Sequence, residues 1–193
     1  MKKLLLINAC IRKNESRTRA LTDAIVPVLG ERYEIEEIDL TETALLPLDH
    51  SRYNARSAGV PDALGAEYAR KVAEADRIVF AAPFWDMSFP AIVKVFCENV
   101  SLYDITFTAN PDGSTRGLCR AEKMLLITTR GMEIADGSTL EQGSPYLKAV
   151  GWLWGIPKLE IISAQGMDMC SAEECTKRLD AAAKQGRILC ETF

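Results

Sequence analysis

The chain has 193 residues, which is within the usual size of one domain and enough to bury a substantial core. Its composition, 48% apolar and 26% charged, is typical of globular proteins. A net charge of −4 gives no basic stripe for nucleic acid and no polybasic segment for anionic lipid. No apolar run has the length needed to cross a bilayer. We therefore expect a single domain over residues 1–193, in the cytoplasm, with no nucleic-acid or membrane partner.

The six cysteines are scattered without a CxxC pair, and His50 is the only histidine. A disulfide framework is not expected in such a chain without a secretion signal, and no ligand cluster surrounds His50. The opening segment MKKLLLINAC has too short an apolar core for a secretory signal, because Arg12 and Lys13 follow at once. We therefore expect a first β-strand there, reduced thiols and no metal site.

Apolar runs of strand length alternate with segments of helical periodicity along the chain. In the first third of the chain, the sequence predicts a strand at 3–9, a helix at 16–29 with Ser16 as N-cap and Gly30 as its stop, a half-exposed edge strand at 33–40 and an irregular loop at 41–60. The middle of the chain is predicted to form a helix at 62–75, a buried strand at 77–82, a helix at 90–100 with Pro90 in its first turn, and a long excursion at 102–120 that turns at 110–113. The remaining elements are a strand at 123–129, a helix at 144–155, a strand at 158–164 and a helix at 172–190. This alternation favours an α/β fold, with one parallel sheet covered by helices on both faces.

Ligands of open α/β sheets bind beyond the carboxyl ends of the strands, where the strand order reverses. This rule nominates the loops after the first, third and fourth predicted strands. The first loop brings hydroxyl and N–H groups to a helix N-terminus, where the dipole favours an anion, and Arg12 and Arg17 add positive charge. Because there is neither a GxGxxG nor a Walker-type lysine loop, a phosphate monoester that needs no metal fits better than a nucleoside triphosphate or a Rossmann-bound dinucleotide. The alternative is that Ser16 only caps the helix and both arginines are solvated.

The loop after the third strand is rich in aromatic residues, namely Phe84, Trp85 and Phe89. Flat apolar surface beside backbone amides suits a planar heteroaromatic ring, although we expect one of the three to pack beneath the loop instead. After the fourth strand, Thr129 offers a hydroxyl and Gly131 permits close approach of a ligand. These loops together predict a site for a phosphorylated, ring-bearing cofactor.

At these loops the sequence resembles the FMN-dependent NAD(P)H azoreductase and quinone-reductase family of flavodoxin-like enzymes. The segment APFWDMSFPAIVKVF is similar to the family's flavin-edge motif, LLITTRG to its glycine-ended strand, and the R-x-x-x-S-x-[TS] spacing to its phosphate loop. The segments ITFTANPDGSTRGL and YLKAVGWLWGIPKLEIISAQGMD also match, so the resemblance covers nearly the whole chain. It implies a flavodoxin-like, doubly wound, five-stranded parallel sheet in the order 2-1-3-4-5, with helices on both faces.

The resemblance also implies the residues that bind FMN. The phosphate would lie on Ser16, Arg17 and Thr18. The isoalloxazine ring would be bordered on one side by Pro83, Phe84, Trp85 and Asp86, and on another by Thr129, Arg130 and Gly131. Phe107 matches an aromatic residue that reaches the active site of the partner subunit, because these enzymes are homodimers with two sites at the interface.

Three residues depart from the family pattern. Cys10 stands where the family often has a phosphate-binding serine, which would weaken FMN retention. Asp86 replaces an asparagine near the flavin, where an ionised carboxylate would lower the flavin potential and a protonated one would donate a hydrogen bond. Met132 replaces a second glycine, which implies a narrower pocket floor.

The activity that the resemblance implies is a ping-pong hydride transfer from NADH or NADPH, through FMN, to a quinone, azo or nitroaromatic compound. No catalytic side chain is expected, since the cofactor carries the chemistry. A flavodoxin-type electron carrier and a flavin-free binding protein stay open as alternatives, although the mild charge and the excursion at 102–120 disfavour the carrier. A phospho-receiver domain is set aside, because the first strand ends in Asn8-Ala9-Cys10 without the acids that it requires.

Overall fold

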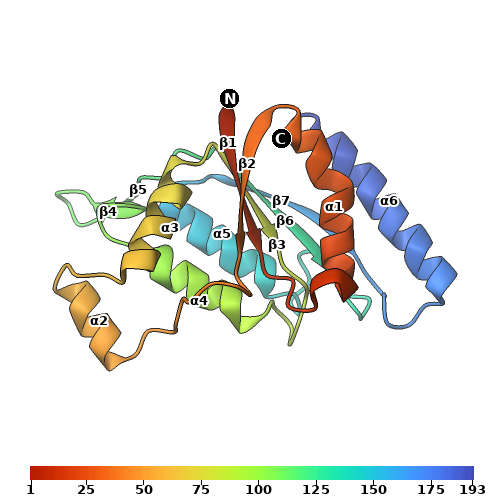
Figure 1. The fold of residues 1–193 in the computed structure, drawn as a ribbon, viewed down its shortest axis with the longest axis horizontal. Helices are drawn as coiled ribbons and strands as arrows, with labels where there is room; N and C mark the ends of the chain where they lie inside the picture. Colours follow the sequence, from red (N-terminus) through yellow and green to blue (C-terminus); the bar gives the residue numbers. More distant parts are fainter.

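A computed structural model describes residues 1–193, and its centre is one five-stranded parallel sheet (Figure 1). The strands are β1 (Lys2–Asn8), β2 (Tyr33–Asp39), β3 (Arg77–Ala81), β6 (Lys123–Thr129) and β7 (Lys158–Ala164). Their spatial order is β2-β1-β3-β6-β7, and every neighbouring pair is parallel. This confirms the predicted order, with β6 and β7 as the fourth and fifth strands. The order reverses between β1 and β3, because the chain runs outward to the edge strand β2 and then returns.

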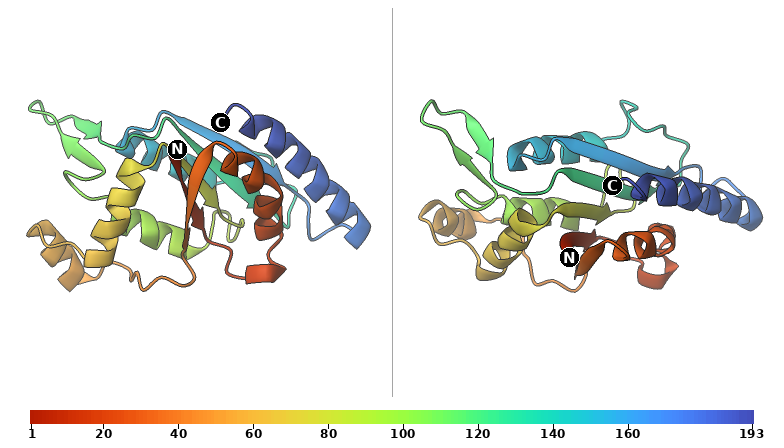
Figure 2. Two further views of the ribbon diagram at one scale, coloured as in Figure 1. Left: turned by 45° about the horizontal axis from the view of Figure 1, so that its top comes forward. Right: turned by 90° about the horizontal axis from the view of Figure 1, so that it is seen from above.

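Helices cover both faces of the sheet, as expected (Figures 1 and 2). One face carries α1 (Arg17–Gly30) and α6 (Ala172–Cys190), whereas α3 (Ala63–Glu74), α4 (Ala91–Val100) and α5 (Gly143–Trp154) cover the other. None of the helices combines the length and the apolar character of a bilayer-spanning segment.

Residues 4–7 of β1 are continuously apolar because helices cover both faces of this strand. Leu4 and Leu6 belong to the core beneath α1 and α6, while Leu5 and Ile7 belong to the core beneath the other three helices. Successive side chains of a strand point to opposite faces, so a strand that is covered twice needs apolar residues at every position. This burial places the end of β1, and the loop that follows it, at the centre of the carboxyl edge.

Polar caps set the helix starts. Ser16 caps α1, as predicted, and Asp62 and Ser171 cap α3 and α6 in the same way. Pro90 is the N-cap residue of α4, one position before the first turn in which it was expected. The helix α5 ends at Trp154 and is followed by the C-cap residue Gly155, whose left-handed φ of 83° is readily adopted by glycine.

The predicted irregular loop at 41–60 is wrong in part, because it contains the helix α2 (His50–Ser57). Asp49 caps this helix by accepting a hydrogen bond from the N–H of Arg52. None of the α2 residues is buried, so the helix has no apolar stripe that would have predicted it.

The predicted excursion at 102–120 contains a two-stranded antiparallel hairpin, β4 (Phe107–Ala109) and β5 (Thr115–Gly117). Figure 2 shows the hairpin projecting from the body, at the opposite end from α1 and α6. Its base touches the end of α5, where Gly117 lies directly against the backbone of Gly155. A Cβ atom on Gly117 would overlap that backbone, so this contact requires glycine.

The expectation of six reduced thiols is wrong, because Cys170 and Cys175 form a disulfide. The chain turns into α6 at Ser171, and this turn brings the two cysteines together although they are not a CxxC pair. The other four cysteines are free.

Candidate functional site

The loops after β1, β3 and β6 converge on one cavity of about 140 Å³ at the carboxyl edge of the sheet. The cavity is lined by Arg12, Ser16, Arg17, Pro83, Phe84, Trp85, Thr129, Gly131 and Asp168. All of these except Arg12 and Asp168 are predicted cofactor-binding residues. Sequence segments more than 100 residues apart therefore meet where the strand order reverses, as the switch-point rule predicts.

The loop after β1, which includes a short 3-10 turn (Lys13–Glu15), presents the N-terminus of α1 to this cavity. The first backbone bond of the helix runs from the N–H of Ala20 to the carbonyl of Ser16. The N–H groups of Arg17 and Thr18 precede this bond and have no acceptor within the helix. With the helix dipole and the Arg17 guanidinium, they form a site that favours an anion.

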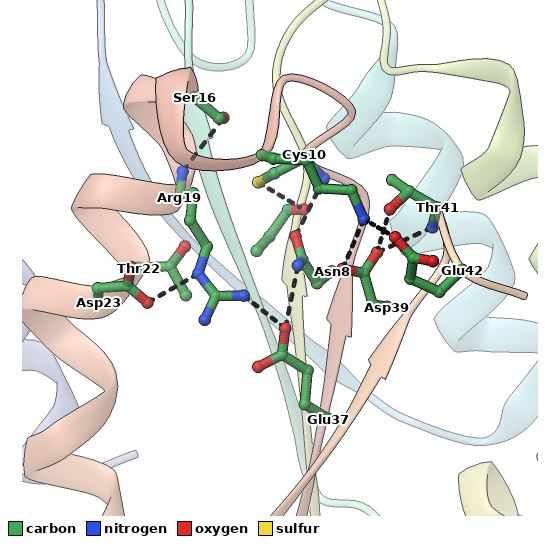
Figure 3. A network of polar contacts seen from close by, with 12 residues as sticks. Asn8, Cys10, Ser16, Arg19, Thr22, Asp23, Glu37, Asp39, Thr41 and Glu42 are labelled. Atoms are coloured by element: carbon green, nitrogen blue, oxygen red, sulfur yellow. Dashed lines mark hydrogen bonds and ion pairs between the residues drawn. The ribbon is translucent and has the colours of Figure 1, made fainter.

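A polar network at the ends of β1 and β2 holds the loop in place (Figure 3). Asn8 accepts a hydrogen bond from the N–H of Cys10 and donates one to Glu37, both at 3.0 Å. Arg19, in the first turn of α1, bridges the same Glu37 and Asp23. The network ties β1, β2 and α1 together beneath the loop.

Asp39, at the end of β2, anchors the loop from its other side. Burial opposes ionisation of this carboxyl, but hydrogen bonds from Thr41 and Lys13 outweigh it and hold the pKa of Asp39 below its usual value. Lys13, which has a left-handed φ of 53°, also pairs with Glu42. The loop thus carries ionic anchors that persist at neutral pH.

Cys10 lies beneath the loop and does not line the cavity. Its side chain is 1% exposed, and its Sγ lies 3.7 Å from the carbonyl oxygen of Ala81. Burial raises the pKa of the Cys10 thiol to about 11, so the group is uncharged at neutral pH. The structure therefore places Cys10 as a buried neutral group under the anion site.

Thr18 is also fully buried, and its hydroxyl pairs with that of Thr129 at 2.7 Å. This bond joins the first turn of α1 to the end of β6. The hydroxyl of Thr18 is therefore already engaged, and only its backbone N–H is left for an anion at the start of α1. Thr129 still lines the cavity.

The loop after β3 divides its three aromatic residues between two roles. Phe84 and Trp85 line the cavity, while Phe89 packs edge-on against Tyr146 at 5.4 Å. Phe89 is thus the aromatic residue that packs beneath the loop, as was expected of one of the three.

Asp86 occupies a tight turn in the same loop and is exposed outside the cavity lining. Two backbone hydrogen bonds between Trp85 and Ser88 close this turn, at 3.1 and 2.8 Å. The two central residues, Asp86 and Met87, have left-handed φ values of 47° and 66°. Asparagine and aspartate are the residues other than glycine that tolerate this conformation best.

Arg130 points away from the cavity and supports it from below. Its guanidinium is 0% exposed and donates to the carbonyl of Ile134 at 2.6 Å and to Asp136 at 2.5 Å. It also lies 5.3 Å from the centre of the Phe84 ring. Arg130 is therefore a positioning residue that fixes the loop after β6 and the ring of Phe84.

Asp168 is the lining residue that sequence analysis missed. It follows β7, and its N–H donates to the carbonyl of Gly131 at 3.0 Å. Its carboxylate pairs with Arg17 at 2.5 Å, and a Cβ atom on Gly131 would overlap this carboxylate. Gly131 thus admits a protein carboxylate, whereas the sequence predicted that it would admit a ligand. Since β7 lies outside the strand-order reversal, the rule that nominated the other loops gave no signal for this one.

Phe107 lies in β4, outside the cavity, and packs edge-on against Tyr103 at 5.9 Å. Phe107 therefore does not contribute to the cavity of its own chain.

A larger groove of about 440 Å³ lies between α3 and the amino-terminal part of the sheet. Both of its lysines are already paired with glutamates of the same groove, Lys71 with Glu36 and Lys3 with Glu74. These lysines are neutralised by their partners, in contrast to the N–H groups at the start of α1.

The family model described as the flavodoxin-like fold matches residues 2–187 of this chain. An FMN-dependent NADH:quinone oxidoreductase of Clostridium perfringens is 32% identical over 177 residues, which is 88% of each chain. One from Caldicellulosiruptor bescii is 30% identical over 203 aligned positions, covering all of both chains. The structure of an FMN-dependent NADH-azoreductase from Bacillus anthracis, in complex with FMN, superposes with a TM-score of 0.84 at 21% identity, covering 100% of this chain and 99% of that one. The chain therefore belongs to the family of FMN-dependent NADH:quinone oxidoreductases, within the flavodoxin-like fold.

Proposed function

We propose that this protein is an FMN-dependent oxidoreductase that passes electrons from NADH or NADPH to quinones, azo compounds or nitroaromatic compounds. The observation that carries the proposal is the convergence of the α1 N-terminus, Arg17 and the Phe84–Trp85 pair on one cavity. We further propose a cytoplasmic location, where the Cys170–Cys175 disulfide would be exposed to reducing thiols.

The residues of the cavity fit FMN. Its phosphate would be held by Ser16, by Arg17 and by the N–H of Thr18, which together offer donors and positive charge to a dianion. Its ring would lie against Phe84 and Trp85, where an apolar surface adjoins backbone groups. When bound, FMN supplies the hydride chemistry.

The protein's own residues orient the cofactor and shape its surroundings. Arg130 and the Thr18–Thr129 pair fix the walls of the cavity from below. Trp85 remains partly exposed at the rim, so its indole offers a flat face to a donor or acceptor that arrives from solvent. These contacts account for orientation and partial exclusion of water without a side-chain acid or base.

The Arg17→Gln variant should bind FMN about tenfold more weakly, the usual effect of losing one charge-assisted hydrogen bond. The measurement is a titration of apo-protein with FMN, followed by flavin fluorescence. Arg52→Gln removes the same charge on α2, outside the cavity, and should bind FMN like the wild type. Wild-type protein that binds FAD and ignores FMN would overturn the proposal.

A turnover assay separates the enzyme from a flavodoxin-type carrier. Under anaerobic conditions, the FMN-loaded protein should oxidise one equivalent of NADH by itself and should turn over further NADH only when a quinone or azo acceptor is present. A protein that holds FMN but does not react with either nicotinamide would instead be an electron carrier.

Replacing Asp86 with asparagine should raise the midpoint potential of bound FMN. A carboxylate beside the ring disfavours the uptake of electrons, and its removal at an exposed position should shift a two-electron couple by on the order of 20 mV. Asparagine also suits the left-handed backbone of this turn, so the fold and the FMN affinity should hardly change. Redox titrations of both proteins at one pH would measure the shift. An unchanged midpoint would remove Asp86 from the vicinity of the flavin.

We also propose a homodimer in which the β4–β5 hairpin carries Phe107 to the partner's flavin site. The projection of the hairpin supports this proposal (Figure 2). So does Trp152 on α5, which is 69% exposed and lines a groove of about 460 Å³ between α4 and α5. Sedimentation should give a dimer. The Trp152→Glu variant should shift it towards monomers with reduced turnover, because a charge would be buried at the interface.

The Phe107→Ala variant should reduce turnover while the dimer persists. A fully active wild-type monomer would contradict both expectations.

A further inference from the structure

The Cys170–Cys175 disulfide lies at the segment that brings Asp168 to the cavity. Cys170 is two residues beyond Asp168, and Cys175 lies in the first part of α6. Neither cysteine is fully buried, and Met169, the residue before Cys170, is 88% exposed. A small thiol in solution can therefore approach this bond.

Backbone bonds to the loop after β6 hold the segment as far as Asp168, and the N–H of Met169 donates to the carbonyl of Gly166 at 3.4 Å. The N–H groups of Gly166, Met167 and Asp168 donate to the carbonyls of Met132, Arg130 and Gly131, each at 3.0 Å. Beyond this ladder the chain enters α6 at its N-cap Ser171, and the disulfide adds a covalent link between the turn and the first part of the helix. The covalent link thus restrains the stretch that immediately follows the Asp168 carboxylate.

The Asp168 carboxylate forms an ion pair with the guanidinium group that a bound phosphate would need, that of Arg17. It pairs with Arg17 at 2.5 Å, and both groups line the cavity. A phosphate dianion at the α1 N-terminus would compete with Asp168 for the same guanidinium and would be repelled by its charge. The position of Asp168 should therefore set how tightly the cavity retains an anion.

We propose that the Cys170–Cys175 pair is a thiol–disulfide exchange site that controls FMN retention through Asp168. This inference rests on the proposed binding of FMN at this cavity. A small dithiol attacks one sulfur, the S–S bond breaks, and both cysteines become thiols with two electrons and two protons from the dithiol, which leaves as its own disulfide. The oxidised pair holds Asp168 on Arg17. Reduction releases the turn, so Asp168 withdraws and Arg17 turns to the phosphate.

The test is a titration of the full-length apo-protein with FMN, before and after treatment with a dithiol. The reduced protein should bind FMN about threefold more tightly, the size of one partly exposed ion pair. The Cys170→Ser/Cys175→Ser variant should bind with the affinity of the reduced protein, whether or not dithiol is present. Asp168→Asn should bind tightly in both states. Cys119→Ser, which alters a free cysteine outside the cavity, should keep the redox dependence.

Two further measurements read the switch without FMN. Alkylation and mass analysis should find four reactive thiols in the oxidised, unfolded protein and six after reduction. Hydrogen exchange at 166–171 should be faster in the reduced protein. Six thiols in the protein purified under air, or exchange that does not respond to reduction, would overturn the inference.

The outcomes separate this inference from the proposed function. Equal FMN affinity in both redox states, or a redox effect that persists in Asp168→Asn, would overturn the inference alone. Absence of FMN binding in every state would overturn the proposed function and the inference with it.

Discussion

Replacing Arg130 with methionine should lower the free energy of unfolding by about 3 kcal/mol, a typical effect of removing one partner of a buried ion pair. Methionine fills much of the same volume, so the loss comes from the polar groups that Arg130 satisfies. The carbonyl of Ile134 would lose its donor, and Asp136 would lose its cation. Because Asp136 is itself partly exposed, water would recover part of the difference. Urea denaturation of the two proteins would measure the effect.

Two related variants test whether the ion pair is responsible. Arg130→Lys keeps the charge but offers a single donor centre, so its loss should be smaller than that of methionine. Asp136→Asn should cost less in the Arg130→Met background than in the wild type, because the two residues then no longer interact. A methionine variant within about 0.5 kcal/mol of the wild type would show that the loop after β6 does not depend on this side chain.

Gly117→Ala should lower the free energy of unfolding by about 2–3 kcal/mol, the usual cost of overpacking a close contact. The new Cβ atom would overlap the backbone of Gly155, which has no side-chain end that could move aside. The hairpin would have to separate from α5. Thermal denaturation should therefore show a lower midpoint, and sedimentation should show a weaker dimer if the hairpin contributes to it.

Gly113→Ala provides the matched control for this variant. Gly113 lies at the tip of the same hairpin, has a left-handed φ of 83° and has open space around its Cβ position. Alanine there should cost only the conformational strain, about 1 kcal/mol, and should leave the dimer intact. A Gly117→Ala protein no less stable than Gly113→Ala would mean that the hairpin does not need its contact with α5.

The sheet was predictable because burial on both faces leaves a clear trace in sequence. Every strand that is covered twice, such as β1, is apolar at consecutive positions. The helix α2 left no such trace, since no residue in it is buried. Asp49 accepts a hydrogen bond from a free N–H group at the N-terminus of the helix, but the polar sequence of α2 is equally compatible with a loop.

The site was predictable where residue type and topology coincide, as in the loop that holds Arg17 or the loop that holds Phe84. Side-chain direction was less predictable. Arg130 belongs to a nominated loop, yet it turns inward because the following residues offer it a carbonyl and a carboxylate. The Cys170–Cys175 pair depends on a turn that brings together residues with no recognisable spacing motif.

The acidic edge strand β2 bears on how copies of this protein meet. Glu34, Glu36 and Glu37 are all exposed along it, while its outer backbone groups have no neighbouring strand. Two such edges brought together would continue the sheet from one molecule into the next, but they would also crowd glutamates against one another. The edge therefore discourages open-ended growth into fibres. A closed, finite assembly of copies would therefore form through surfaces other than the β2 edge.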